Sequence, residues 1–212
     1  KCKSISYTYT EPVTAIEYVI DIAKLAKKSG LKNIIVSNGY INEKPLKELC
    51  KYIDAANIDL KGFNESFYKK NCFGSLKPVL KTLKILKNNR VWLEITNLII
   101  PGLNDNLKEI DKMCKWIKTN LGSETPLHFS RFFPMHRMLD KKITSIDILK
   151  KARDTAIKNK LKYVYIGNIS GLDENTYCAK CKSSVIERHG FSITKMNIKR
   201  DKCIKCDAKI SG

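Results

Sequence analysis

The sequence predicts an α/β protein with a parallel sheet, followed by a small four-cysteine module. Two observations carry this prediction: strand-like and helix-like segments alternate along most of the chain, and two Cys-x-x-Cys pairs follow the last strand. The expected strands are 5–10, 33–39, 55–61, 91–100, 127–133 and 163–166. Strand–helix–strand repeats require right-handed crossovers, so the product is a doubly wound sheet or a barrel.

The helices are expected from apolar residues that recur at helical spacing. Residues 13–28 carry such a pattern and end before Gly30, which suits a helix terminus. Further helical segments are expected at 44–52, from 65 onward, and at 77–88, 107–121 and 145–159, where Thr144 or Ser145 can cap the last one.

Length and composition predict two domains, an α/β domain at 1–170 and a module at 171–212. The 40 Lys and Arg residues against 21 Asp and Glu residues give a net charge of +19. The lysines recur on the outward faces of the helical segments, which indicates solvated surface and disfavours a nucleic-acid role. No apolar run is long enough to span a membrane, and the cysteine pairs favour metal binding in a reducing cytoplasm.

The segment 55–61 has an unusual polar face. Ala56, Ile58 and Leu60 share one face of this strand, while Asn57, Asp59 and Lys61 share the other. An Asp and a Lys within a sheet are costly unless they pair with each other or with something bound. Two interpretations follow: a structural ion pair without a ligand, or a curved sheet whose concave side holds a polar ligand.

The six strands also finish on polar residues, namely Glu11, Asn38, Lys61, Asn97, Arg131 and Asn168. Ligands of parallel α/β proteins bind at the carboxyl ends of the strands, so one site lined by these groups is predicted. The alternative is that polar residues occur there because loops begin there.

The four cysteines of the module are Cys178, Cys181, Cys203 and Cys206, in two pairs separated by 21 residues. Each Cys-x-x-Cys turn aims two sulfurs at one ion, so the two turns supply a tetrahedral set of thiolates. Zinc is favoured over a rubredoxin-like iron, and two disulfides are disfavoured. A closed four-thiolate site is structural, and it must stabilise a segment too short to bury much of a core.

Eight segments carry a resemblance to a known family. They are 7–12 (YTYTEP), 37–40 (SNGY), 55–63, 92–96 (WLEIT), 100–105 (IPGLND), 130–132 (SRF), 163–168 (YVYIGN) and the four-cysteine tail. In this order they resemble radical S-adenosylmethionine (radical SAM) enzymes, specifically the AmmeMemoRadiSam-system proteins related to pyruvate formate-lyase activating enzyme.

The resemblance implies a partial (β/α)6 TIM-like barrel, incomplete at its N-terminus, with a zinc-ribbon-like or rubredoxin-like module. It implies that S-adenosylmethionine (SAM) lies across the strand ends. Glu11 would bind the ammonium of the SAM methionine, Lys61 its carboxylate, and Asp59 would lie near the ribose. The full set of implied cofactor-binding residues is Thr10, Glu11, Asn38, Asp59, Lys61, Leu98 and His136, with Leu98 and His136 beside the adenine. No residue of the chain is predicted to be catalytic.

The resemblance also has departures. The family binds a [4Fe-4S] cluster through Cys-x3-Cys-x2-Cys, and the sequence has no such triplet. The cluster ligands are therefore expected in an N-terminal segment or partner chain, without which this chain would be inactive. Val36 stands where the activating enzyme has an acidic cation ligand, so no monovalent-cation site is expected.

The complete enzyme would generate a 5'-deoxyadenosyl radical and abstract hydrogen from a substrate. A glycyl position on a partner protein, or partners of the Memo or AMMECR type, are the implied candidates. Two other classes are less favoured: a zinc-ribbon nucleic-acid-binding protein that uses the basic surface, and a metal-independent barrel enzyme.

Overall fold

The computed structural model describes residues 2–169, 172, 175–190 and 192–211. The chain divides into two compact units. The first comprises residues 1–98 and 119–121, and the second comprises residues 99–118 and 122–212. The predicted division at residue 171 separates the module from the α/β segments, and it stays a prediction.

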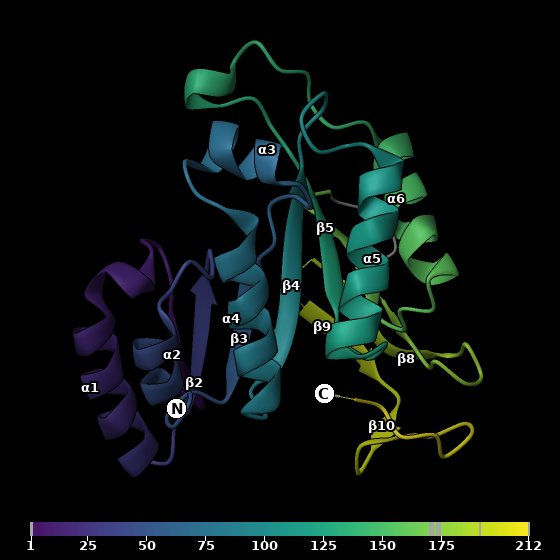
Figure 1. The fold of residues 1–212 in the computed structure, drawn as a ribbon. Coiled ribbons are helices and arrows are strands. Elements are labelled where there is room, and N and C mark those ends of the chain that lie inside the picture. Colours follow the sequence, from purple (N-terminus) through teal and green to yellow (C-terminus); the bar gives the residue numbers. More distant parts are fainter. Residues whose placement is uncertain (1, 170–171, 173–174, 191, 212) are drawn as a thin grey trace. The chain divides into compact units, whose positions relative to one another are not determined.

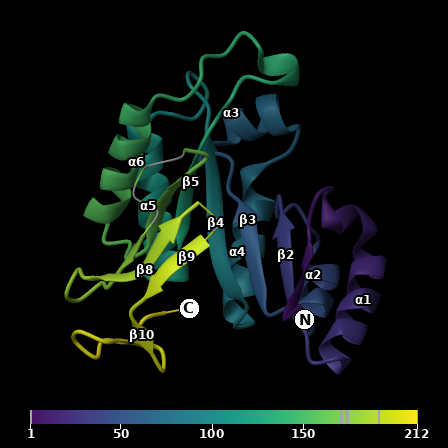
Figure 2. The same cartoon turned by 180° about the vertical axis from the view of Figure 1, so that it is seen from behind.

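The first unit is built on parallel strands β1 (Ser4–Tyr7), β2 (Lys32–Ser37), β3 (Ala55–Asp59) and β4 (Trp92–Ile99, whose last residue belongs to the second unit). Three longer helices connect them: α1 (Ile16–Lys28), α2 (Glu43–Leu49) and α4 (Leu76–Asn88). All three lie on one side of the strands (Figures 1 and 2). Short turns complete the unit: the 3-10 turn Pro12–Ala15, α3 (Glu65–Phe67) and a π-helical turn at Tyr68–Cys72.

The strands of this unit have one buried face and one half-exposed face. In β3, Ala56 and Ile58 are buried while Asn57 and Asp59 are half-buried, and β4 alternates in the same way over its whole length. The helices cover the apolar face, because side chains at a spacing of three and four residues point to one side of a helix. The prediction that β3 has a polar face opposite the core is therefore confirmed.

The second unit contains α5 (Leu107–Leu121, apart from its last three residues), β5 (Leu127–Arg131), the 3-10 turn His136–Met138, α6 (Ile146–Lys158) and β6 (Val164–Gly167). Strands β5 and β6 are parallel, with Leu127 opposite Val164. The tail adds antiparallel strands β7 (Thr176–Tyr177), β8 (Ser184–His189) and β9 (Ser192–Met196), and the ribbon β10 (Ile198–Lys199) with β11 (Lys202–Cys203).

The six parallel strands follow the chain in order, β1-β2-β3-β4-β5-β6. This confirms the predicted α/β fold with six parallel strands. A doubly wound sheet reverses its strand order part-way, so the observed order excludes that alternative. Closure into a partial barrel stays a prediction.

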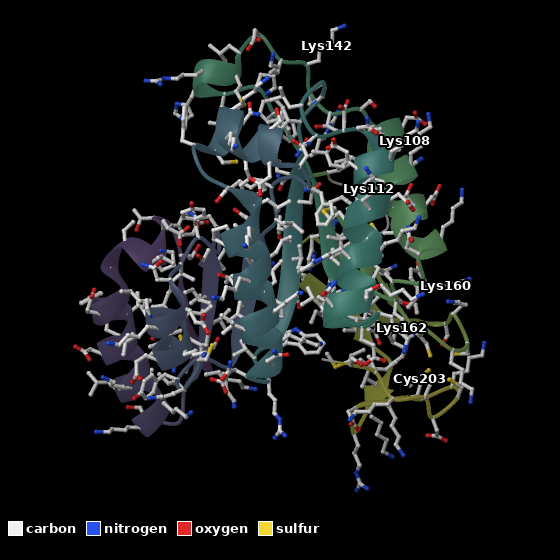
Figure 3. All side chains as sticks on the ribbon, viewed as in Figure 1. Lys108, Lys112, Lys142, Lys160, Lys162 and Cys203 are labelled. Carbon is white, nitrogen blue, oxygen red and sulfur yellow. The ribbon has the colours of Figure 1, made fainter. Side chains whose placement is uncertain are left out.

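Lys108 and Lys112 on the later helix Leu107–Leu121 follow the predicted pattern of exposed helical lysines. Lys142 and Lys160, outside the helices, are exposed as well, and the side chains of all four point away from the ribbon (Figure 3). None of the helices in the described part of the chain has the length and hydropathy that a bilayer crossing needs.

Candidate functional site

Glu11 joins the carboxyl ends of β1 and β2. Its carboxylate accepts hydrogen bonds from the Ser37 hydroxyl at 2.5 Å, from the Asn38 backbone N–H at 2.8 Å and from the Val13 backbone N–H at 3.3 Å. A carboxylate has about four acceptor positions, so these three donors leave about one. The side chain is thus held rigidly, with capacity for one further donor.

The turn after β2 is shaped by Gly39. Its φ is +69°, and a Cβ on this residue would lie 2.7 Å from the Ile58 side chain. The Ser37 hydroxyl also accepts from the Gly39 N–H at 3.0 Å, and the Asn38 side-chain oxygen accepts from the Tyr40 N–H at 2.8 Å. Glycine is therefore needed here for both backbone conformation and close approach.

Asp59 and Lys61 form an ion pair with an Nζ–O distance of 2.7 Å. Their side chains are 33% and 41% exposed, so water screens the pair and its own contribution to stability is small. The pairing fits the structural interpretation, and the exposure leaves both groups accessible to a ligand. The backbone N–H of Lys61 donates to the Tyr68 hydroxyl, and burial raises the pKa of that hydroxyl.

A pocket of about 260 Å³ brings two of the predicted residues together. Asn38 and Lys61 both line it, with Tyr40, Tyr68, Phe73 and Val79 among the other lining residues. Because Glu11 binds the backbone of Asn38, the ends of β1, β2 and β3 form one continuous polar region. We call Glu11, Ser37, Asn38, Asp59 and Lys61 the strand-end cluster.

The contacts described above do not include the other predicted site residues, Thr10, Leu98 and His136. Thr10 is exposed immediately before Glu11, and Leu98 is half-buried on the polar face of β4. His136 is exposed in the second unit, where it begins a 3-10 turn with a φ of +50°. The roles of all three stay predictions.

The remaining strand-end polar residues make hydrogen bonds to backbone carbonyls that hold the fold. The Asn97 side chain is buried and donates to the Leu60 carbonyl at 2.6 Å. Arg131 donates through Nε to the Thr144 carbonyl at 2.9 Å, and Asn168 donates to the Arg131 carbonyl at 3.2 Å. These contacts fit the alternative that polar residues occur where loops begin.

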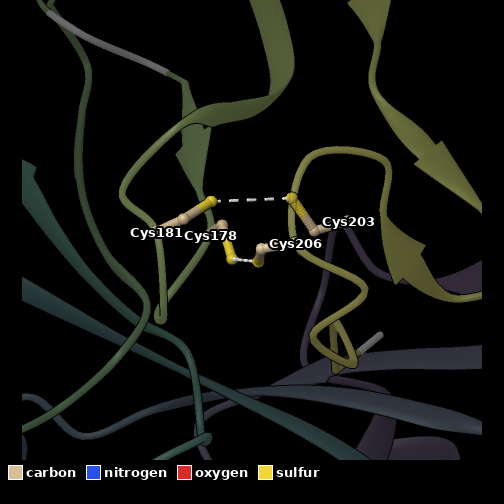
Figure 4. A group of neighbouring side chains, drawn as sticks. All are labelled: Cys178, Cys181, Cys203 and Cys206. Atoms are coloured by element: carbon tan, nitrogen blue, oxygen red, sulfur yellow. Dashed lines mark hydrogen bonds between the residues drawn. The ribbon is translucent and has the colours of Figure 1, made fainter.

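The four cysteines of the tail lie together, with their sulfurs all within 4.8 Å of one another (Figure 4). The Sγ–Sγ distance is 3.6 Å between Cys178 and Cys206, and 3.8 Å between Cys181 and Cys203. A disulfide needs about 2.05 Å. A tetrahedral ion with metal–sulfur bonds of about 2.3 Å requires sulfurs about 3.8 Å apart, so the geometry fits a four-thiolate metal site.

Ser183 lies beside two of these sulfurs. Its Oγ is 2.9 Å from Cys181 Sγ and 3.6 Å from Cys203 Sγ. The neighbouring hydroxyl lowers the pKa of the Cys181 thiol to about 6, which favours the thiolate that metals require. Among the described residues of the tail, Val185 and Ile210 are buried together with Cys178 and Cys203, and Ile186, Ile198 and Ala208 pack partly buried against them.

Comparison with known proteins identifies the family. The profile of the Radical SAM superfamily matches residues 1–117. The chain belongs to this superfamily. The predicted relation to radical SAM enzymes is therefore confirmed.

Two curated relatives of this radical SAM chain are informative. An uncharacterized protein of Methanocaldococcus jannaschii is 45% identical over 212 residues, which are 99% of this chain and 63% of that protein. The pyruvate formate-lyase-activating enzyme of Clostridium pasteurianum is 26% identical over 158 residues, which are 74% of this chain and 64% of that enzyme. The chain thus spans less than two thirds of the length of these relatives.

The solved structures support the fold. A domain of a pyruvate-formate lyase-activating enzyme from Bacteroides vulgatus superimposes with a TM-score of 0.67 at 17% identity, covering 78% of this chain and 99% of that domain. At 17% identity, this likeness shows that the two proteins share a fold and carries no conclusion about function.

The sequence did not predict the contacts that three hydroxyl residues make. Ser37 fixes Glu11, Thr96 donates to the Asn57 side chain at 2.8 Å, and Thr144 donates to the Ile99 carbonyl at 2.5 Å. Each is a small hydroxyl residue whose role depends on a partner distant in sequence. Ser37 and Thr96 lie inside the segments 37–40 and 92–96 that resemble the family, and Thr144 was expected only as a possible helix cap.

Proposed function

We propose that the chain is the SAM-holding C-terminal portion of a radical SAM enzyme of the activating-enzyme type. The observation that carries the proposal is the strand-end cluster, which presents a rigid carboxylate and an accessible Asp–Lys pair at the carboxyl ends of β1–β3. The methionine part of SAM is a zwitterion, so it needs an acceptor for its ammonium and a cation for its carboxylate.

In this proposal Glu11 accepts from the ammonium at its remaining acceptor position. Lys61 binds the carboxylate, and Asp59 holds the Lys61 ammonium in place or turns toward the ribose. Asn38 and Thr10 lie near the cofactor, while Leu98 and His136 flank the adenine. The protein's contribution is to bind and orient the cofactor and to exclude water.

The [4Fe-4S] cluster that the family implies needs cysteine ligands outside these 212 residues, because the sequence lacks the Cys-x3-Cys-x2-Cys triplet. We propose that another segment or chain supplies them. When both groups are bound, they supply the one-electron chemistry that makes hydrogen abstraction possible.

The activating-enzyme relatives carry names of enzymes that activate other enzymes, such as pyruvate formate-lyase. We propose by analogy that the substrate is a glycyl-type position on a partner protein, in the setting of AmmeMemoRadiSam or Memo/AMMECR-type proteins, in the cytoplasm.

We further propose that the four cysteines bind one structural metal ion, zinc in preference to iron. The support is the sulfur spacing and the all-thiolate donor set, which suits soft metals. Metal analysis of the purified chain that finds neither zinc nor iron would reject this part.

The experiment for the SAM site is anaerobic calorimetry with the chain joined to a cluster-bearing segment. Lys61→Ala and Glu11→Ala each remove a charge-assisted contact of about 1.5–3 kcal/mol, so SAM affinity should fall by about 10-fold to 150-fold. Lys32→Ala is the matched control, because Lys32 also pairs with an aspartate at 2.7 Å, but from the opposite end of β2. Unchanged affinity in both site variants would refute the assignment.

A further inference from the structure

The pocket beside the strand-end cluster has apolar walls that the proposed function does not use. Its floor is formed by Tyr68 and Val79, which are 3% and 1% exposed. Its other lining residues include the aromatic rings of Tyr40 and Phe73, which are 48% and 91% exposed. Gly74 allows this arrangement, because a Cβ there would lie 3.2 Å from the Tyr40 ring.

The backbone that presents Phe73 is unusual. The π-helical turn Tyr68–Cys72 precedes it, and Phe73 itself is left-handed with a φ of +52°. A bulky residue rarely adopts this conformation, and π-turns and strained residues concentrate at functional sites. The strained turn places a large apolar ring in solvent, where within this unit it makes little contact.

The size of the pocket limits its occupant. Sites for drug-sized molecules have volumes of about 300–1,000 Å³, and this pocket has about 260 Å³. The space suits one large side chain better than a whole cofactor. Asn38 and Lys61 at its polar end belong to the strand-end cluster, so a side chain bound here lies beside the proposed SAM site.

The surroundings favour a protein segment over a free small molecule. Exposed aromatic side chains around a buried floor are typical of the centres of protein interfaces. Lys69 and Lys70 are exposed on the same turn, next to Asn71 and Cys72 of the pocket lining. They complement acidic residues in a bound segment.

We propose that this pocket receives one large apolar side chain, such as Leu, Met or Phe, from an acidic extended segment of the substrate protein. Tyr40 and Phe73 grip the side chain, and the segment is thereby positioned next to the cofactor. The inference rests on the proposed function, because that function supplies the protein substrate.

The test is an NMR titration of the full ¹⁵N-labelled chain with N-acetyl-leucine amide, N-acetyl-phenylalanine amide and N-acetyl-alanine amide. The first two probes should shift the backbone amides of residues 71–74 saturably, and the alanine probe should not. Phe73→Ala and Tyr40→Ala should each lower the affinity for the phenylalanine probe at least fivefold. Tyr18→Ala is the control, because Tyr18 is 69% exposed and lies on α1, outside the pocket lining.

Probes that fail to bind saturably, or that bind equally well to the Phe73→Ala and Tyr40→Ala variants, would overturn the inference. Benzoate that binds more tightly than the phenylalanine probe would assign the pocket to a small aromatic acid instead. A SAM titration of the chain joined to a cluster-bearing segment separates the two proposals. SAM binding without probe binding refutes only the pocket. Probe binding without SAM binding refutes the proposed function, and with it the assignment of the bound segment to a substrate protein, while the apolar pocket itself stands.

Discussion

The strand-end cluster and the four-cysteine cluster are organised by different forces. Glu11, Ser37 and Asn38 are held by hydrogen bonds at the ends of strands whose opposite faces are buried under three helices. The four cysteines have only a small apolar cluster around them, and β9 of the tail is exposed along its whole length. Under the functions proposed above, the first cluster would stay ordered without its cofactor, whereas the second would depend on its metal.

This difference shows which of the two clusters has its binding geometry fixed by the folded protein itself. Preorganised groups bind without the cost of being ordered, so the strand-end cluster suits a cofactor that is exchanged in each reaction cycle. A site that folds around its ion suits a permanent ligand. The predictions that follow perturb the two clusters and the strands that hold the first one.

The largest effect is expected from metal removal. Binding of structural zinc contributes about 10–16 kcal/mol in small zinc domains, so chelation or Cys178→Ser should unfold the tail. In ¹⁵N-edited NMR spectra the amides of β7–β11 should collapse to random-coil positions, while the amides of β1–β4 keep theirs. Cys114→Ser is the control, because Cys114 is buried in α5 outside the cluster. If the tail amides kept their dispersed chemical shifts after complete metal removal, the proposed dependence of the tail on its metal would be contradicted.

Gly39→Ala should destabilise the strand ends by about 2–4 kcal/mol, because a Cβ there meets Ile58 at 2.7 Å and the φ is +69°. Gly30→Ala is the matched variant: its φ is +73°, and no atom lies within 4 Å of its Cβ position. The Gly30→Ala variant should lose only about 1 kcal/mol of unfolding free energy, through backbone strain. Equal losses in urea unfolding would show that the packing at Gly39 is not as tight as described.

Ser37→Ala removes the hydroxyl that binds both Glu11 and the Gly39 N–H. The expected loss is about 1–2 kcal/mol of unfolding free energy, since a charge-assisted hydrogen bond is broken. SAM affinity should fall several-fold because Glu11 becomes less rigid. If the variant kept the unfolding free energy and the SAM affinity of the wild type, Ser37 would have no role in holding Glu11.

Asp54→Asn should have the smallest effect and a defined pH dependence. Burial acts to raise the pKa of Asp54, but the ion pair with Lys32 and the Asn33 N–H outweigh it and lower the pKa. A lowered folded-state pKa stabilises the protein above the unfolded-state pKa of about 3.9, and this stabilisation is lost as the pH falls through the folded-state pKa. The side chain is 33% exposed, so the loss at pH 7 should be at most about 1 kcal/mol. The unfolding free energies of variant and wild type should converge in acid, and a constant difference down to pH 2 would contradict this assignment.

Much of the fold could be predicted because its signals are local. Alternating apolar residues fix the strands, and all six were found within a few residues of their bounds. The polar face of β3 and the two Cys-x-x-Cys turns are also local patterns, which predicted the Asp59–Lys61 pair and the clustering of the four sulfurs.

The missed features depend on contacts between distant residues. Nothing near Ser37 in the sequence shows that its hydroxyl meets Glu11, 26 residues earlier. Asn97 follows the strand-end pattern, yet alternation places it on the buried face, where it binds the Leu60 carbonyl. Sequence position predicted the end of the strand, whereas the register between strands decided which side chains face the site.

The most direct measurement is a binding cycle that pairs two ligands with one substitution. SAM and 5'-methylthioadenosine share the adenosine part, and only SAM carries the methionine ammonium and carboxylate. If the strand-end cluster binds the amino-acid part, Lys61→Ala should lower the affinity for SAM by at least 10-fold in calorimetry. The affinity for 5'-methylthioadenosine should stay within twofold of the wild-type value. Equal losses for both ligands, or none for SAM, would contradict the account.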